Sequence, residues 1–160
     1  MPPLVLLIKP ASGNCNMRCK YCFYADEASN RDVFSYGMMS EETLETIVKK
    51  SLERAQNQCT FAFQGGEPTL RGLEFYRKLI EFENKYNTKG IKVQNSIQTN
   101  GYVIVEEWAE FLGENHFLVG LSLDGTKEIH DRFRVDAKGN GTFKTVLHVS
   151  QLFNKYKVEY

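Results

Sequence analysis

The stretch Cys15-Asn16-Met17-Arg18-Cys19-Lys20-Tyr21-Cys22 carries three cysteines with the spacing C-x3-C-x2-C, directly after the first apolar part of the chain. Thiolates are the usual ligands of iron–sulfur clusters, and a loop can turn three of them toward one side of a cluster. One iron would then lack a protein ligand. The spacing therefore predicts a cluster with one coordination position open to a small molecule.

Two other interpretations of these cysteines compete with a cluster. A structural zinc site needs a fourth ligand, which Cys59 or one of the histidines His116, His130 and His148 would have to supply. A disulfide framework suits a small secreted domain, but four cysteines in 160 residues without a secretory signal do not favour an oxidising compartment.

Composition indicates an ordinary globular domain. The 160 residues suffice for one domain with a sizeable core, and 20 basic residues balance 20 acidic ones. A net charge of zero leaves no broad basic field for nucleic acid or an anionic membrane, so neither is expected as a partner. The apolar run at 4–8 is too short for a signal sequence or a membrane span, which predicts a cytoplasmic protein.

Hydrophobic periodicity predicts alternating strands and helices. The run at 4–8 reads as a strand buried on both faces, and Ser40 as the N-cap of an amphipathic helix that extends to Ala55. Further strands are predicted at 59–63, 91–99 and 117–123, and helices at 73–86, closed by Gly90, at 105–112, stopped by Gly113, and at 143–153. The polar stretch 27–37 and the charged stretch 126–141 are predicted as connections.

This alternation implies parallel strands joined by right-handed crossovers. A complete barrel of this kind needs roughly 250 residues. The predicted fold class is therefore α/β, a partial TIM-type (β/α) barrel of about four and a half units. The last residues, 157–160, read as the start of a fifth strand, so we expect the chain to be the front part of a longer protein.

Polar clusters follow every predicted strand. The cysteine loop follows the first, Gly65-Gly66-Glu67-Pro68 the second, Thr99-Asn100-Gly101 the third, and Ser122 with Asp124 the fourth. Sites in parallel α/β folds form where these loops converge, beyond the carboxyl ends of the strands. We therefore expect one site on this rim.

Several rim residues suit a nucleoside or amino-acid ligand, although each also has a purely structural reading. Gly65 and Gly66 allow close backbone approach to a ligand, or simply end a strand. Asp124, with Ser122 beside it, can accept hydrogen bonds from ribose hydroxyls, or cap a turn. Arg134 can pair with a ligand carboxylate, or be a solvated cation.

Three other residues are assigned a place from sequence. Tyr21, between the second and third cysteines, is expected to pack against a cluster or a planar ligand. Cys59 starts a strand at the opposite end of the sheet and reads as a buried core thiol. His130 reads as a packed or capping histidine rather than a base.

In combination these motifs resemble the radical S-adenosylmethionine superfamily, in the cysteine spacing, Gln64-Gly-Gly-Glu-Pro-Thr-Leu70, Gln98-Thr-Asn-Gly101 and Ser122-Leu-Asp-Gly125. The stretches Ile129-His-Asp-Arg-Phe-Arg-Val135 and Gly139-Asn-Gly-Thr-Phe143 more narrowly resemble the anaerobic sulfatase-maturating enzymes. The resemblance covers the whole chain but only the front portion of that family's length.

The resemblance implies a [4Fe–4S] cluster on Cys15, Cys19 and Cys22, with S-adenosylmethionine at the fourth iron. One electron would cleave the sulfonium, and the resulting 5′-deoxyadenosyl radical would take a hydrogen from the substrate. By the matching positions, Gly66, in the turn with Gly65, would contact the methionine amino group. Ser122 and Arg134 would hold the carboxylate or the ribose. Asp124 would support the ribose, and Tyr21 would lie near the adenine.

In the sulfatase-maturating family the substrate is a Cys or Ser of a sulfatase polypeptide, oxidised to Cα-formylglycine, and the electron comes from a donor such as a ferredoxin or flavodoxin. Gln64 would then contact the substrate. The catalytic base, the rest of the barrel and a cysteine-rich C-terminal domain are expected beyond Tyr160. The alternatives are a modifier of another ribosomal peptide and a non-catalytic zinc-binding module.

Overall fold

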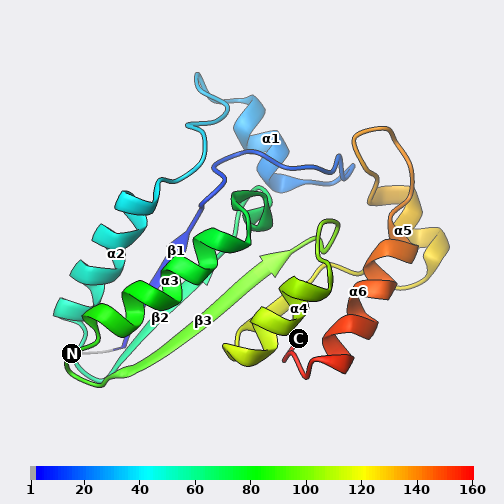
Figure 1. Ribbon diagram of the computed structural model, residues 1–160. Coiled ribbons are helices and arrows are strands. Elements are labelled where there is room, and N and C mark those ends of the chain that lie inside the picture. Colours follow the sequence, from blue (N-terminus) through cyan, green and yellow to red (C-terminus); the bar gives the residue numbers. More distant parts are fainter. Residues whose placement is uncertain (1–2) are drawn as a thin grey trace.

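A parallel sheet of four strands forms the centre of the protein, whose computed structural model describes residues 3–160 (Figure 1). The strands are β1 (Leu4–Ile8), β2 (Gln58–Phe63), β3 (Lys92–Thr99) and β4 (Leu118–Leu121), hydrogen-bonded in that order. Ile8 pairs with Phe63, and Phe63 with Ile97, so the carboxyl ends of β1 to β3 lie almost level. The sheet is open, which confirms the predicted partial barrel.

A fifth strand begins at the end of the chain. Glu159 forms an isolated parallel bridge with Leu118, and the Val119 amide donates to its carbonyl at 2.8 Å. The predicted strand opening at 157–160 is therefore found at Glu159 only, because Lys157, with φ +54°, still belongs to the turn after α6.

The crossovers contain the four helices that the periodicity predicted. These are α2 (Glu41–Arg54), α3 (Leu73–Tyr86), α4 (Glu106–Glu114) and α6 (Phe143–Lys155). Ser40 caps α2, because its hydroxyl accepts a hydrogen bond from the Thr43 amide at 3.1 Å. No helix in residues 3–160 has the length and apolar content needed to cross a membrane.

Three short helices were not predicted: α1 (Phe23–Ser29), the 3₁₀ helix η1 (Pro68–Arg71) and α5 (Lys127–Phe133). Each lacks an apolar stripe long enough to be recognised, and α1 and α5 each bury a single residue, Ala28 and His130. All three lie in the loops at the carboxyl ends of the strands. Their positions therefore depend on contacts made around the site.

The prediction that Gly113 stops its helix was wrong. The helix α4 continues to Glu114, and a Cβ atom at Gly113 would overlap the carbonyl oxygen of Tyr156. Glycine is present here because the end of α6 packs directly on the backbone of α4. The fourth strand is also shorter than predicted, at Leu118–Leu121.

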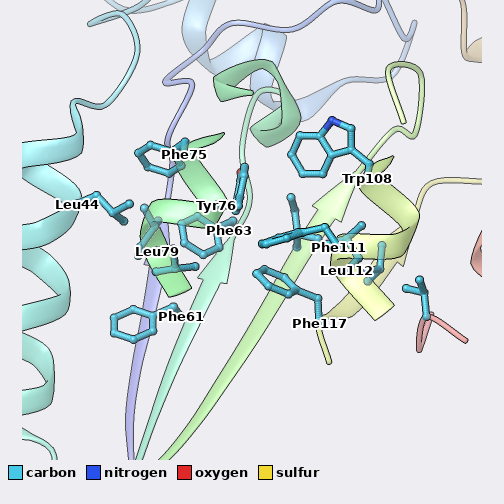
Figure 2. Close-up of a cluster of buried hydrophobic side chains, with 14 of the residues drawn as sticks. Leu44, Phe61, Phe63, Phe75, Tyr76, Leu79, Trp108, Phe111, Leu112 and Phe117 are labelled. Atoms are coloured by element: carbon cyan, nitrogen blue, oxygen red, sulfur yellow. The ribbon is translucent and has the colours of Figure 1, made fainter. Parts of the chain in front are cut away.

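Helices cover one face of the sheet, and the core lies between them and the strands (Figure 2). Tyr76 is central to it, with ring centroids 5.2 to 5.4 Å from those of Phe63, Phe75 and Trp108. Its hydroxyl donates to the Pro68 carbonyl at 2.9 Å. The core therefore holds the segment that follows the glycine turn.

The other face of the sheet is not covered in the described chain. Val5 and Leu7 are 64% and 63% exposed, so the prediction that the first strand is buried on both faces was wrong for this chain. By contrast, Cys59 is fully buried at the amino end of β2, which confirms it as a core thiol. Only the helix-covered face supplies the hydrophobic core.

Glu83 of α3 is a buried carboxyl group on the core side of the sheet. Its Oε2 accepts from Asn95 Nδ2 at 3.1 Å, whereas Glu83 Oε1 and Asn95 Oδ1 have no hydrogen-bond partner within residues 3–160. Burial raises the pKa of Glu83 from 4.5 to about 7, although the Asn95 hydrogen bond opposes this shift.

Glu83→Gln is therefore expected to stabilise the protein at alkaline pH. When a carboxyl group has a higher pKa in the folded than in the unfolded state, the protein becomes less stable as the pH rises, here from 4.5 to about 7. Glutamine does not titrate, so its advantage in the free energy of unfolding should grow by about 2–3 kcal/mol between pH 5 and pH 8. Urea unfolding of both proteins at the two pH values measures this. A pH-independent difference would contradict the assignment.

Candidate cofactor site

A pocket of about 290 Å³ lies at the carboxyl end of the sheet. Loops that follow all four strands contribute to it, as the positions of the polar clusters predicted. Its lining residues are Cys15, Cys19, Tyr21, Cys22, Phe23, Tyr24, Gln64, Gly65, Gly66, Glu67, Gln98, Thr99, Asn100, Ser122 and Arg134. The pocket thus brings together every candidate site residue except Asp124, which lies beside it.

The cysteine loop is held by a segment more than a hundred residues later in the chain. The amides of Arg18 and Lys20 donate to the carbonyls of Val135 and Phe133, at 2.8 and 2.9 Å. Buried Met17 anchors the loop, and its amide donates to Cys15 Sγ at 3.4 Å. The loop is therefore fixed on the end of α5 and the residues directly after it, a pairing for which the sequence carries no periodic signal.

The third cysteine also starts a helix. Cys22 is the N-cap of α1, and its Sγ accepts a hydrogen bond from the Ala25 amide at 3.4 Å. Burial raises the pKa of Cys15 and of Cys19, with the Arg134 guanidinium opposing the rise at Cys19. Metal binding at this loop would therefore release protons from the thiols.

The cysteine geometry fits a cluster better than a single ion. Within residues 3–160 no three His, Cys, Asp or Glu side chains gather closely enough to hold one metal ion. Cys59 lies at the amino end of β2, away from the loop, and buried His130 is engaged in hydrogen bonds, so neither completes a zinc site. In a [4Fe–4S] cluster each thiolate binds a different iron, which suits three thiols around one pocket.

Both glycines of the turn after β2 are required by close contacts. Gly65 has φ +102° and Gly66 φ +59°, backbone conformations that L side chains rarely adopt. A Cβ at Gly65 would overlap the Lys9 side chain, and one at Gly66 would overlap the Asn14 carbonyl. The turn therefore packs directly against the cysteine loop.

Glu67 connects three of the loops, a role that the sequence did not reveal. It is 1% exposed, and its Oε1 accepts from the hydroxyl groups of Thr69 and Thr99 at 2.6 and 2.8 Å and from the Thr69 amide at 3.0 Å. Its Oε2 accepts from the Asn100 amide at 2.7 Å, and its own amide donates to the Asn14 carbonyl at 2.8 Å. A glutamate in a turn is usually exposed to solvent, so this role could be recognised only from the burial of Glu67 in the structure.

Asp124, Tyr21 and Arg134 form a polar cluster at the edge of the pocket. Arg134 Nε lies 3.0 Å from Asp124 Oδ2 as an ion pair, yet its N–H has no aligned acceptor. Tyr21 donates its hydroxyl to the same Oδ2. Burial tends to raise the pKa of Asp124, but the Tyr21 hydrogen bond and the Arg134 charge outweigh it and lower that pKa. Burial and the same hydrogen bond raise the pKa of Tyr21 to about 12.

His130 supports this cluster from behind and confirms the prediction of a packed histidine. Thr142 Oγ1 donates to the Arg134 carbonyl at 3.1 Å and lies 3.0 Å from His130 Nε2, while the Asp124 amide lies 3.3 Å from His130 Nδ1. A neutral ring with its proton on Nε2 satisfies all these contacts. Burial, together with Arg134, lowers the pKa of His130 and favours this neutral form.

Gln98 and Tyr24 line the pocket without having been assigned a role there from sequence. Gln98 Nε2 donates to Ser122 Oγ at 3.1 Å, and Gln64 Nε2 donates to Tyr24 Oη at 2.8 Å. Gln98 on β3 pairs with Gly120 on β4, and a Cβ atom at Gly120 would overlap the side-chain amide of Gln98. The alternating polar residues Gln94, Ser96 and Gln98 of β3 were the sequence signal for a polar face on the side of the sheet away from the core.

The comparison with known families agrees with this geometry. The sequence profile of the radical SAM superfamily matches residues 10–160. The chain belongs to the radical SAM superfamily. A cysteine-type anaerobic sulfatase-maturating enzyme of Clostridium novyi is 58% identical over 160 residues, which are all of this chain and 43% of that protein. A serine-type enzyme of Bacteroides thetaiotaomicron is 37% identical, over 99% of this chain and 38% of its own length.

Solved structures of a radical SAM protein share the fold. The structure of histidine-tagged anSMEcpe with bound AdoMet (S-adenosylmethionine) has a TM-score of 0.93 and 56% identity, over 99% of this chain and 42% of that one. Native anSMEcpe with bound AdoMet and Cp18Cys peptide has a TM-score of 0.91 and 56% identity, with the same coverage. This chain therefore spans about two fifths of the length of these relatives.

Proposed function

We propose that the protein is a radical SAM oxidoreductase that converts a cysteine of a sulfatase polypeptide to Cα-formylglycine. The observation that carries the proposal is the convergence of the three cysteines and the candidate AdoMet-binding residues on one pocket. The higher identity to the cysteine-type than to the serine-type relative, 58% against 37%, supports cysteine as the target.

In this proposal Cys15, Cys19 and Cys22 hold a [4Fe–4S] cluster. When bound, the cluster supplies the electron for reductive cleavage of AdoMet. The three thiols line one pocket, and no other side chain of the cysteine loop can act as a thiolate ligand, so the cluster retains one open position.

Five further pocket residues, together with Asp124 beside the pocket, are assigned to AdoMet. Because Arg134 lines the pocket, its guanidinium is the donor that we assign to the carboxylate of the methionine moiety, with Ser122 beside it. The glycine turn at Gly65 and Gly66 presents its backbone to the amino group. Asp124 binds the ribose from the edge of the pocket, and Tyr21 packs against the adenine.

The partners follow from the same assignment. Gln64, held by Tyr24, contacts the sulfatase segment, in keeping with the peptide bound in the anSMEcpe structure. A ferredoxin or flavodoxin supplies the electron. The four cysteines are free, which supports a reducing, cytoplasmic location. The relatives are longer than this chain, and we place the rest of the barrel, the catalytic base and a cysteine-rich domain in further chain beyond Tyr160.

Anaerobic reconstitution of the full-length protein tests the proposal. The reconstituted protein should contain about four iron and four sulfide ions at this site. Its electron paramagnetic resonance spectrum after reduction should change on addition of AdoMet. Incubation with matched sulfatase peptides that contain Cys or Ser should give formylglycine by mass spectrometry, faster from Cys. Zinc without sulfide, or an unchanged spectrum with AdoMet, would refute the cofactor assignment.

Gly120→Ala should weaken AdoMet binding while the cluster remains. The new methyl group would displace the Gln98 amide, and Ser122 Oγ would lose its hydrogen bond from Gln98. Loss of one neutral hydrogen bond corresponds to about a three- to tenfold weaker affinity. Equilibrium dialysis with AdoMet measures this, and iron content serves as the control. An unchanged affinity would show that Gln98 does not orient Ser122.

A further inference from the structure

Asn100, at the carboxyl end of β3, directs its side chain at the first cysteine of the loop. Its Nδ2 lies 3.7 Å from Cys15 Sγ and 2.9 Å from Asn16 Oδ1, so its two amide hydrogens have different acceptors. Neither contact is needed to form the sheet, because both side chains lie beyond the strands.

The orientation of Asn100 is fixed from two sides. Its backbone amide donates to buried Glu67 at 2.7 Å, and its side-chain Oδ1 accepts from the Tyr102 amide at 2.9 Å. Since Oδ1 is engaged with Tyr102, the Nδ2 group must face the cysteine loop. Asn100 is therefore held as a donor toward Cys15.

Asn16 orients the Asn100 amide rather than adding a donor. Its Oδ1 accepts from Asn100 at 2.9 Å and lies 3.9 Å from Cys15 Sγ, so the oxygen of the Asn16 side chain faces the cysteine. With one amide hydrogen of Asn100 on Asn16, the other is directed at Cys15. The Cys15 thiolate, or a sulfur atom of a cluster bound to it, is an acceptor of the right kind.

We propose that Asn100, oriented by Asn16, acts as a positioning residue that directs an amide donor at the Cys15 corner of the cluster and raises its reduction potential. The inference rests on the proposed cluster site. Hydrogen bonds to cluster sulfurs are among the features that set the potential, because they stabilise the extra negative charge of the reduced state. The pair thereby makes one-electron reduction easier.

The test is a redox titration of the full-length reconstituted protein, followed by electron paramagnetic resonance. Asn100→Ser keeps an acceptor for the Tyr102 amide but cannot reach Cys15, and Asn16→Ala removes the acceptor that orients the Asn100 amide. Each variant should lower the ratio of reduced to oxidised cluster at a fixed potential by about threefold to tenfold. For one electron, tenfold equals about 59 mV.

Tyr102→Phe is the matched control. It lies in the same loop and removes a hydroxyl that contacts Asp136 rather than the cysteines, so its potential should equal that of the parent protein. An unchanged potential in both asparagine variants, or an equal shift in the Tyr102 variant, would overturn the proposal. Iron and sulfide content is measured separately, and loss of the cluster from the parent protein itself would instead refute the proposed function.

The potential of a variant cannot be measured if the variant does not take up a cluster. A spectroscopic measurement on the parent protein then tests the proposal. With asparagine side chains labelled with ¹⁵N, hyperfine spectroscopy of the reduced cluster should detect a coupling from an amide nitrogen close to sulfur. Absence of any ¹⁵N coupling in the reduced, fully loaded protein would overturn the proposal.

Discussion

Cys19→Ala is expected to abolish cluster binding and, with it, all turnover. Cys19 is the middle ligand of the loop, and its removal leaves Cys15 and Cys22, too few to hold a [4Fe–4S] cluster. After anaerobic reconstitution, about four iron and four sulfide ions per chain should be lost, together with the visible absorbance of this cluster. Formylglycine should become undetectable in the peptide assay.

Cys59→Ala is the matched control for that loss. This thiol is fully buried at the opposite end of the sheet. Removing it should cost about 1 kcal/mol of folding free energy through lost packing, with an unchanged iron content. Equal iron in the Cys19 variant and the parent protein, or loss of iron in the Cys59 variant, would contradict the assigned ligand set.

Glu67→Gln should produce the largest loss of folding stability among single changes near the site. Glutamine has nearly the same shape, but its amide group would face donors that now point at a carboxylate oxygen. The Thr99 hydroxyl can rotate away, whereas the Asn100 amide cannot. We expect a decrease of about 3 kcal/mol in the free energy of unfolding, measured by urea denaturation.

Glu81→Gln controls for the removal of a charge. Glu81 forms an exposed pair with Lys78 at 2.6 Å on the surface of α3, where an ion pair contributes little. Its loss should change the free energy of unfolding by less than about 0.5 kcal/mol. A Glu67 variant that unfolds at the same urea concentration as the Glu81 variant would show that Glu67 does not join the loops.

The arrangement around Glu67 gives the further inference its structural basis. The Glu67 carboxylate accepts from the Asn100 backbone amide, and the Glu67 backbone amide donates to the Asn14 carbonyl at the entrance of the cysteine loop. A change at Glu67 should therefore alter both stability and reduction potential, whereas Asn100→Ser should act mainly on the potential. Measuring both quantities on the same preparations separates the two effects.

Much of the fold could be predicted because its determinants are local. Apolar runs of strand length and three-and-four spacing placed all four strands and the four longer helices. The helices α1 and α5 were missed because each buries one residue and thus shows no periodic stripe. The exposure of one face of β1 was also not predicted, because a run of five apolar residues looks the same in sequence whether one face or both faces of the strand are covered.

The candidate site also has a part that could be predicted from sequence and a part that could not. The cysteine spacing, the glycine turn and the polar residues after each strand could be located from sequence, because parallel strands bring their carboxyl ends together. The residues that orient them could not. Glu67, Gln98 and Asn100 have ordinary polar side chains, and their roles come from burial and from partners 24 to 85 positions away.

The sequence by itself determined the number and order of strands, the rim on which the chemistry gathers, and three thiols spaced for a cluster. Only the tertiary structure decided how that rim is held: the cysteine loop hydrogen-bonded to residues 133–135, Glu67 buried between three loops, and Asn100 directed at Cys15. The physical reason is that periodicity and spacing act between neighbours along the chain. Burial and hydrogen-bond direction, in contrast, exist only once distant segments have packed together.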